Sequence, residues 1–272
     1  MTTERLDVAL VVRGLARSRT AAQAAVAEGR VRVDGAPAAR PALRVGDDAV
    51  LEVSADAGWV GRAAGKLDAA LDAFAIDVRG RRALDLGAST GGFTQVLLER
   101  GAASVVALDV GHDQLVPTLR DDPRVVVVEG ENARHLTPAR LAELTDGGPA
   151  PDLVVADLSF ISLALVLPAI AAVAAADADV VLLVKPQFEV GRSRVRGGIV
   201  HDAAERAAAV RGVLEAAAAL GLRTAGVVAS PVPGTRGNRE ALVHLHRLRG
   251  GDPTEWSASI ERAVRSGAGE VR

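Results

Sequence analysis

Apolar positions in the first 54 residues follow helical spacing and then alternate. Leu6, Leu10 and Val11 recur on one side of a helix over residues 4–13, and Gly14 can end it. Ser18 can cap a second helix that runs to residue 27. Residues 31–33 and 49–53 alternate between apolar and polar side chains, as half-buried strands do. The pattern therefore predicts two helices and a small hairpin.

From residue 66 onward, strand-like and helix-like segments alternate regularly. Expected strands are 83–86, 104–109, 125–129, 152–157, 179–184, 224–229 and 241–248, and expected helices include 66–74, 92–100, 163–176, 202–220 and 253–265. This order predicts an α/β domain with a doubly wound parallel sheet. Residues 55–65 are small and glycine-containing, so we expect a small α+β domain at 1–54, a linker at 55–65 and the α/β domain at 66–272.

The first strand of the α/β domain leads into a glycine-rich turn, and residues 83–94 read ALDLGASTGGFT. Its glycines permit positive φ and let a ligand approach bare backbone. The spacing is neither G-x-G-x-x-G nor a P-loop. D-x-G-x-x-x-G-G after a strand resembles the first motif of S-adenosylmethionine (SAM) dependent methyltransferases, whereas the alternative is an ordinary tight turn. The candidate cofactor residues here are Asp85, Gly87, Ser89, Thr90, Gly91 and Gly92.

Polar residues stand where four of the expected strands end: Asp85, Asp109, Asp157 and Lys185. In an open α/β sheet the carboxyl ends of the strands form the ligand crevice, so we expect these side chains at one rim. Asp109 is placed to accept both ribose hydroxyls of a cofactor. Each of them taken singly could instead be a turn or cap residue, and their joint occurrence favours a site.

Composition narrows the classes of function. The 272 residues are 49% hydrophobic and 2% aromatic, with a net charge of −2 and no cysteine, which excludes disulfides, thiolate metal sites and cysteine nucleophiles. The histidines have no ligand spacing, so we expect no metal and interpret His244 and His246 as a surface pair. The apolar run 163–176 is too short to span a bilayer and the N-terminus has no apolar signal core, so we expect a soluble, cytoplasmic protein without stable membrane association.

Arginines cluster between the first two expected helices and beside the strand that follows. The segment RLDVALVVRGLARSRTAAQAAVAEGRVRVDGAPAARP resembles the RNA-binding domain named after small-subunit ribosomal protein S4. The resemblance implies phosphate contacts, whereas the alternative is a solvated charged face. The implied contacts are Arg13, Arg17, Ser18, Arg19 and Arg32, to which we add Arg62 of the linker and, in the basic connection 186–200, Arg192, Arg194 and Arg196.

Several further segments carry a resemblance in the same order along the chain: VGRAAGKL, DLGASTGGFT, VVALDVGHDQL, EGENAR, DLSFISL, LLVKPQFE and GTRGNRE. They are similar to the FtsJ-like ribose 2′-O-methyltransferases and, with the N-terminal module, to the TlyA (haemolysin A-like) family of rRNA methyltransferases. The resemblance implies a catalytic set of Lys66, Asp157, Lys185 and Glu240. It also implies SAM contacts at Gly91, Phe93, Asp109, Val110, Asn132 and Asp157.

We therefore expect methyl transfer from SAM to a ribose 2′-hydroxyl of ribosomal RNA, with ribosomal subunits as partners and, from the resemblance, cytidine in both subunits. Lys185 is the expected central group: if neutral it takes the hydroxyl proton, and if charged it stabilises the developing alkoxide. One alternative is a non-catalytic RNA-binding assembly factor with a vestigial SAM fold. Another is a haemolysin-like membrane activity, which the lack of a spanning or strongly basic amphipathic segment disfavours.

Overall fold

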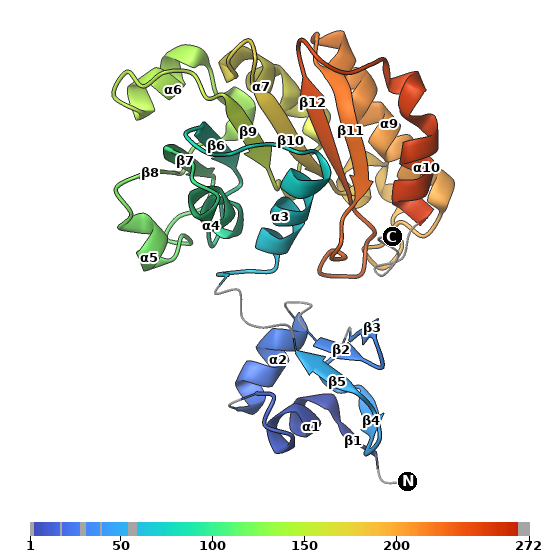
Figure 1. Ribbon diagram of the computed structural model, residues 1–272. Helices are drawn as coiled ribbons and strands as arrows, with labels where there is room; N and C mark the ends of the chain where they lie inside the picture. The colour runs from blue at the N-terminus through green and yellow to red at the C-terminus, as the bar shows by residue number, and fades with distance from the viewer. Residues whose placement is uncertain (1–2, 17, 28–30, 39, 54–58, 266–272) are drawn as a thin grey trace. The chain divides into compact units, whose positions relative to one another are not determined.

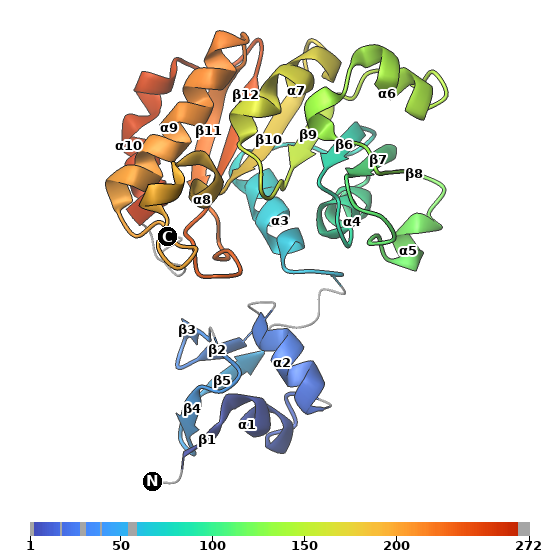
Figure 2. The same ribbon diagram turned by 180° about the vertical axis from the view of Figure 1, so that it is seen from behind.

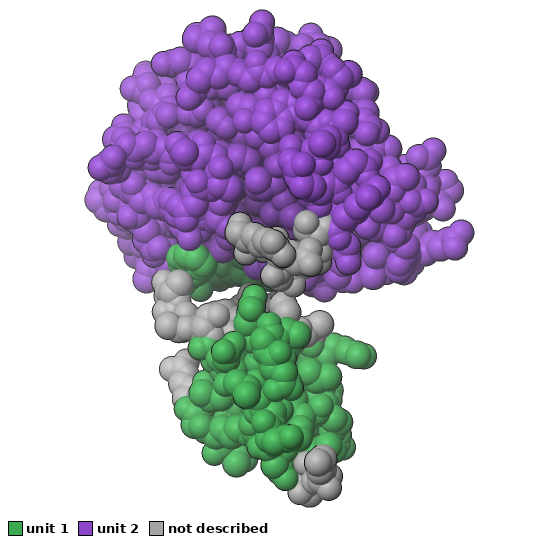
Figure 3. All heavy atoms as spheres, turned by 45° about the vertical axis from the view of Figure 1, so that its right-hand side comes forward, with its two compact units in different colours: residues 1–62, 268–272 green, residues 63–267 purple. Residues whose placement is uncertain are grey.

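The chain divides into two compact units, Met1–Arg62 with Ala268–Arg272 and Ala63–Gly267, which Figure 3 shows in different colours. The computed structural model describes residues 3–16, 18–27, 31–38, 40–53 and 59–265. Each unit has its own apolar core.

The N-terminal unit packs two helices, α1 (Leu6–Val12) and α2 (Arg19–Ala27), beside short strands. Strand β2 (Val31–Val33) pairs with β3 (Ala36–Pro37) and with β5 (Leu51–Val53), both antiparallel. A second pair, β1 (Thr3–Arg5) with β4 (Arg44–Gly46), was not apparent from the alternation pattern. Leu6 and Leu10 of α1 are fully buried, because the helical spacing places them on the face that meets α2.

The larger unit is built on a seven-stranded sheet with the order β11-β12-β10-β9-β6-β7-β8 (Figures 1 and 2). Its strands are β6 (Arg82–Leu86), β7 (Ser104–Asp109), β8 (Val125–Glu129), β9 (Leu153–Ala156), β10 (Asp179–Val184), β11 (Arg223–Ala229) and β12 (Ala241–His246). Six of them run in the same direction, whereas β12 lies between β10 and β11 and pairs antiparallel with both. The fully parallel sheet is thus wrong at β12, because the short connection from β11 contains no crossover helix and returns the chain antiparallel.

Helices cover both faces of this sheet, with α7 and α9 on one side and α3 and α4 on the other (Figures 1 and 2). The helices are α3 (Ala63–Ala73), α4 (Gly92–Glu99), α5 (Pro117–Arg120), α6 (Pro138–Leu144), α7 (Leu167–Val173), α8 (Pro186–Glu189), α9 (Ala203–Ala219) and α10 (Ser257–Arg265). Single 3₁₀ turns are η1 (Ala133–His135), η2 (Leu163–Leu165), η3 (Arg192–Arg194) and η4 (Pro253–Trp256). The expected helix 163–176 is therefore broken into η2 and α7, and Pro168 stands in the first turn of α7.

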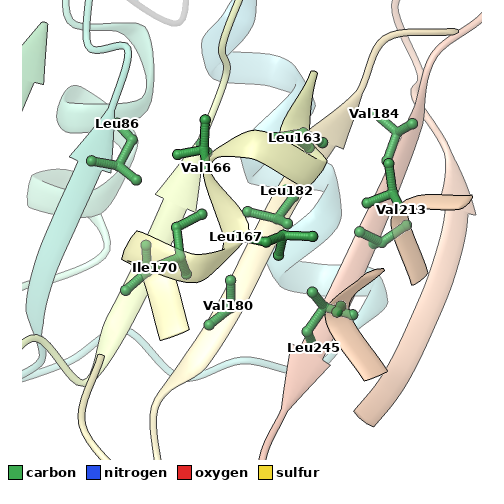
Figure 4. Packing of buried hydrophobic residues seen from close by; sticks show 14 of the residues in the cluster. Leu86, Leu163, Val166, Leu167, Ile170, Val180, Leu182, Val184, Val213 and Leu245 are labelled. Carbon is green, nitrogen blue, oxygen red and sulfur yellow. The ribbon is translucent and has the colours of Figure 1, made fainter. Parts of the chain in front are cut away.

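The main core lies between the sheet and the helices α6, α7, α9 and α10. Figure 4 shows Leu163, Val166, Leu167 and Ile170 packing over strand residues such as Leu182. Ala, Val and Leu fill this core because the chain has almost no aromatic residues. The packing fixes the strands and therefore the turns that follow them.

Strand β12 is interior to the sheet, so its histidines are buried. His244 is 5% exposed and His246 is 3% exposed. The His244 ring packs on Phe74, which follows α3, at a centroid distance of 5.4 Å. The interpretation of the two histidines as a surface pair is therefore wrong, because β12 lies between β10 and β11 and both side chains are buried.

The strand order reverses beside β6, which positions the site. After β6 the chain continues to β7 and β8 on one side and later returns to β9 on the other. A crevice forms at such a switch point, outside the carboxyl ends of the strands. The turns after β6, β7, β9 and β10 meet at this rim.

Candidate active site

A cavity of about 500 Å³ lies at the carboxyl ends of β6, β7 and β9. We call it the cofactor cavity. The residues that line it include six of the sequence candidates: Gly87, Ser89, Asp109, Val110, Asn132 and Asp157. The other cofactor candidates, Asp85, Thr90, Gly91, Gly92 and Phe93, do not line it. They instead build the turn beneath it.

Two glycines of the turn are required by their surroundings. Gly87 has φ +83°, and a Cβ there would lie 2.9 Å from the backbone oxygen of Asp157. Gly91 has φ +102° and caps α4, and a Cβ there would overlap the side chains of Leu115 and Leu119. Gly87 thus lets the turn after β6 approach the turn after β9, which keeps the cavity wall thin and close to Asp157.

Asp109 is oriented by backbone donors at the end of β7. One carboxylate oxygen accepts from the amide of Ser89 at 2.9 Å and the other from the amide of Gly111 at 2.8 Å. Each carboxylate oxygen has further acceptor capacity. The carboxylate is therefore held in place with positions left over for vicinal hydroxyls of a ligand in the cofactor cavity.

Asp85 lies fully buried under the turn. Its Oδ2 accepts from the Thr94 hydroxyl at 2.6 Å, while its Oδ1 is buried without a hydrogen-bond partner among the described residues. Burial raises the pKa of Asp85 to about 7, and the nearby carboxylates of Asp157 and Asp109 act in the same direction. The first motif thus contains an acid that is half neutral near physiological pH.

The four residues of the predicted catalytic set form two lysine–carboxylate pairs. Lys185 Nζ lies 2.6 Å from Asp157 Oδ1, and Lys66 Nζ donates to Glu240 Oε2 at 2.6 Å. Lys66 is on α3 and Glu240 directly precedes β12, so residues 174 positions apart meet here. The Lys66–Glu240 pair is almost fully buried, whereas Lys185 and Asp157 are partly exposed.

A second cavity, of about 390 Å³, opens beside Lys185. We call it the nucleotide cavity. It is lined by Lys185 and Glu240, and it shares Ser159 and Phe160 with the cofactor cavity. Lys185 Nζ also donates to Ser159 Oγ at 2.8 Å. The Lys185–Asp157 pair therefore joins the two cavities, with Asp157 lining one and Lys185 lining the other.

Two phenylalanines at this wall were missed by sequence reasoning. Phe160 is 92% exposed with φ +66°, a conformation that is strained for a bulky side chain, and its ring lies 5.3 Å from that of Phe188. Both rings line the nucleotide cavity. The available signal was their scarcity, since the chain has four phenylalanines and two of them follow strand ends.

Several arginines predicted to contact RNA also make contacts within the N-terminal unit. Arg13 donates to the carbonyls of Ala49 at 2.6 Å and Gly46 at 2.8 Å, so it holds the loop before β5. Arg19 pairs with the buried Asp7 at 3.0 Å. Arg32 donates to the Gly35 carbonyl.

The remaining predicted RNA contacts have varied surroundings. Ser18 Oγ accepts from the amide of Ala21 at the start of α2. Arg17 lies outside the described residues. In the connection after β10, Arg194 lies 3.8 Å from Glu205, and Arg192 and Arg194 form η3. Arg196 bridges through its backbone to Ile199, and Arg62 is half-buried at the end of the first unit.

Among the residues that the structure describes, no group of three His, Asp or Glu side chains is arranged to hold a metal ion. Within the same part of the chain, every helix is too short or too polar to cross a bilayer.

Comparisons with known proteins match both units. The FtsJ-like methyltransferase family model matches residues 59–247, and the S4 domain model matches residues 4–51. The 16S/23S rRNA (cytidine-2′-O)-methyltransferase TlyA of Mycobacterium tuberculosis is 57% identical over 244 residues, which cover 89% of each chain. Hemolysin A of Brachyspira hyodysenteriae is 37% identical and covers 89% of this chain and 99% of its own. A solved structure from Streptococcus thermophilus is 36% identical with a TM-score of 0.73, and covers 97% of this chain and 96% of its own.

Proposed function

The chain belongs to the TlyA group of the FtsJ-like methyltransferases, and from this premise we propose that it methylates the 2′-hydroxyl of cytidines in 16S and 23S ribosomal RNA. The observation that carries the proposal is the Lys185–Asp157 pair between two cavities. Transfer between two substrates needs their reacting atoms held side by side in an aligned geometry, and this pair lies where the two cavities adjoin.

The cofactor cavity fits SAM by its own chemistry. Asp109 presents oriented carboxylate oxygens suited to ribose hydroxyls, and Val110 and Leu158 supply apolar wall. Gly87 keeps the backbone beside Asp157 free of a side chain. When bound there, SAM supplies an activated methyl group on a sulfonium. The protein must supply the aligned nucleophile.

We assign to Lys185 the role of binding the nucleophile, which is the 2′-hydroxyl of the RNA. As an ammonium it has three N–H donors: one is donated to Ser159 Oγ, and the charge is paired with Asp157 Oδ1 at 2.6 Å. A remaining donor serves the 2′-hydroxyl oxygen, where a charge-assisted hydrogen bond stabilises the developing negative charge; the new bond from oxygen to methyl forms as the bond from sulfur to methyl breaks, and the hydroxyl proton passes to solvent. Asp157 and Ser159 orient Lys185, and the buried Lys66–Glu240 pair fixes the adjoining wall of the nucleotide cavity.

The nucleotide cavity suits a single unstacked nucleoside. Unstacked RNA bases are commonly bound by stacking on aromatic side chains, and enzymes that act on one base extrude its nucleotide from the stack. The rings of Phe160 and Phe188 lie at this cavity and expose such a surface. We assign the N-terminal unit to binding rRNA within the ribosomal subunit through phosphates, with Ser18, Arg19 and Arg32 at its exposed surface.

The test uses the full chain, ribosomal subunits that lack the modification, and SAM with a labelled methyl group. Lys185→Ala should lower the transfer rate by about a hundredfold or more, because it removes a donor to developing charge. Its affinity for SAM, measured by calorimetry, should be unchanged because Lys185 does not line the cofactor cavity. Asp109→Ala is the matched variant and should lose SAM affinity.

Unchanged labelling by the Lys185→Ala variant would reject the mechanism. RNA binding by the unmodified protein without any SAM affinity would reject the enzyme and support a ribosome-binding factor. Mapping of the methylated positions identifies the nucleotide.

A further inference from the structure

The nucleotide cavity contains one cation that no carboxylate neutralises. Lys185 pairs with Asp157, and Lys66 pairs with Glu240. Arg236 lines the same cavity, and its side chain has no hydrogen bond or ion pair to any residue that the structure describes. The cavity therefore carries one uncompensated positive charge, located on a guanidinium.

The position of Arg236 is set by its neighbours. Its guanidinium and Cδ lie over Gly198, which has φ +83°, and a Cβ on Gly198 would come within 2.7 Å of Arg236 Nη1. The turn that carries Arg236 is closed by the Gly234 amide, which donates to the Asn238 carbonyl at 2.9 Å. The absence of a side chain at Gly198 thus lets the arginine lie against bare backbone.

The surface beneath Arg236 is itself held firmly. Asn238 is 2% exposed, and its side chain donates to the Gly198 carbonyl at 2.6 Å and accepts from the Val200 amide at 3.0 Å. Arg206 then donates to the carbonyls of Val200 and His201. Arg236 therefore rests on an ordered segment, which lowers the entropy lost when its guanidinium binds a ligand.

We infer that Arg236 binds a backbone phosphate next to the target nucleotide and so positions the ribose against Lys185. A guanidinium offers paired N–H donors that match two phosphate oxygens, and one unit of positive charge matches one phosphodiester. Arg192 and Arg196 lie in the neighbouring connection but do not line the cavity, so they are less suited to this role. The inference deepens the proposed function and rests on it.

The experiment compares Arg236→Ala and Arg236→Lys with Arg223→Ala in the full chain. Arg223 is the matched control: it is exposed, its side chain has no partner among the described residues, and it lies at the first residue of β11, whereas Arg236 lies in the connection that follows the other end of this strand. Arg236 is also exposed, so its truncation should leave the fold intact. The measurements are kcat and KM for ribosomal subunits, the salt dependence of subunit binding, and SAM affinity.

Arg236→Ala should raise KM for the subunits about ten- to hundredfold, with a smaller change in kcat and no change in SAM affinity. The slope of log affinity against log salt should fall by about one, because one phosphate contact is lost. Arg236→Lys should recover part of the loss, since it restores charge without the paired donors. Arg223→Ala should match the unmodified protein.

Two results would overturn the inference. An unchanged KM and salt slope for Arg236→Ala would show that the phosphate lies elsewhere, and a loss of SAM affinity would show that Arg236 serves the cofactor instead. Failure of the proposed function is distinguishable, because the unmodified protein would then methylate no subunit.

Discussion

The seven-stranded sheet has a buried aspartate at each of two opposite rims, one formed by the amino ends of its parallel strands and one by their carboxyl ends, and the surroundings of the two aspartates differ. At the amino end of β10, Asp179 is 2% exposed and accepts from Arg81 at 2.7 Å, from Arg249 at 2.8 Å and from His244 at 2.8 Å. At the carboxyl end of β6, Asp85 accepts one hydrogen bond, from Thr94, and leaves Oδ1 without a partner among the described residues.

The difference appears in the direction of the two pKa shifts. The His244 hydrogen bond and the positive charges around Asp179 lower its pKa in spite of burial, whereas burial raises the pKa of Asp85 to about 7. A carboxylate with several cationic donors stabilises the fold. A buried carboxylate left with unmet acceptor capacity costs stability, and such costs are typical of functional sites.

The largest expected effect on stability is that of removing the Asp179 carboxylate. Asp179→Ala leaves His244 buried without its acceptor and Arg81 and Arg249 without their partner, so we expect a loss of about 3–5 kcal/mol in the free energy of unfolding. Urea unfolding at pH 7 measures it. The SAM affinity of the folded fraction should be unchanged, because Asp179 lies at the rim opposite the cofactor cavity. A loss of unfolding free energy below about 1 kcal/mol would contradict a stabilising role for Asp179 and its three partners.

Asp85→Asn tests the buried carboxylate at the carboxyl-end rim of the sheet. Because the folded-state pKa is raised above the ordinary value, protonation favours the fold, and the unmodified protein loses stability as pH rises from about 4 to about 7. Asparagine stays neutral, so at pH 8 we expect the free energy of unfolding of this variant to exceed that of the unmodified protein by about 2–4 kcal/mol. Urea midpoints from pH 5 to 8 give the difference, and parallel curves for the two proteins would contradict the raised pKa.

The residues at the carboxyl-end rim could be predicted to lie together from the sequence. Asp85, Asp109, Asp157 and Lys185 follow parallel strands, and parallel strands bring their carboxyl ends to one rim, so the cofactor cavity follows from local pattern. The resemblance added Lys66 and Glu240. Their contact could not be derived from periodicity, because it depends on where β12 enters the sheet.

The contacts of Asp179 at the amino-end rim could not be predicted either, because they also depend on where β12 enters the sheet. Asp179 ends an apolar run in the sequence, and its three partners come from residues 81, 244 and 249. Only the antiparallel entry of β12 between β10 and β11 places His244 beside it. Phe160 was missed because its exposure follows from a positive φ that its residue type does not indicate.

A third carboxylate, Glu189, lies between these extremes and gives the smallest expected effect. It accepts from Ser162 Oγ at 2.6 Å and from the Leu163 amide at 2.9 Å, so it ties α8 to the turn that carries Phe160, and the structure shows no cation paired with it among the described residues. Burial raises the pKa of Glu189, so its ionised form lowers stability as pH rises above its ordinary range.

Glu189→Gln keeps an oxygen acceptor for the Leu163 amide and removes the charge, but it replaces the acceptor of the Ser162 hydroxyl with an amide NH2 group, which can donate to Ser162 Oγ instead. At pH 8 we expect its free energy of unfolding to equal that of the unmodified protein or to exceed it by up to about 1 kcal/mol. Glu189→Ala, which leaves the Leu163 amide without its acceptor, should instead lose about 1 kcal/mol or more. Urea unfolding of both variants separates the effect of hydrogen bonding from the effect of charge. Equal losses of unfolding free energy in the two variants would show that the charge itself stabilises this part of the fold. Glu189 would then differ from Asp85, whose ionisation lowers stability.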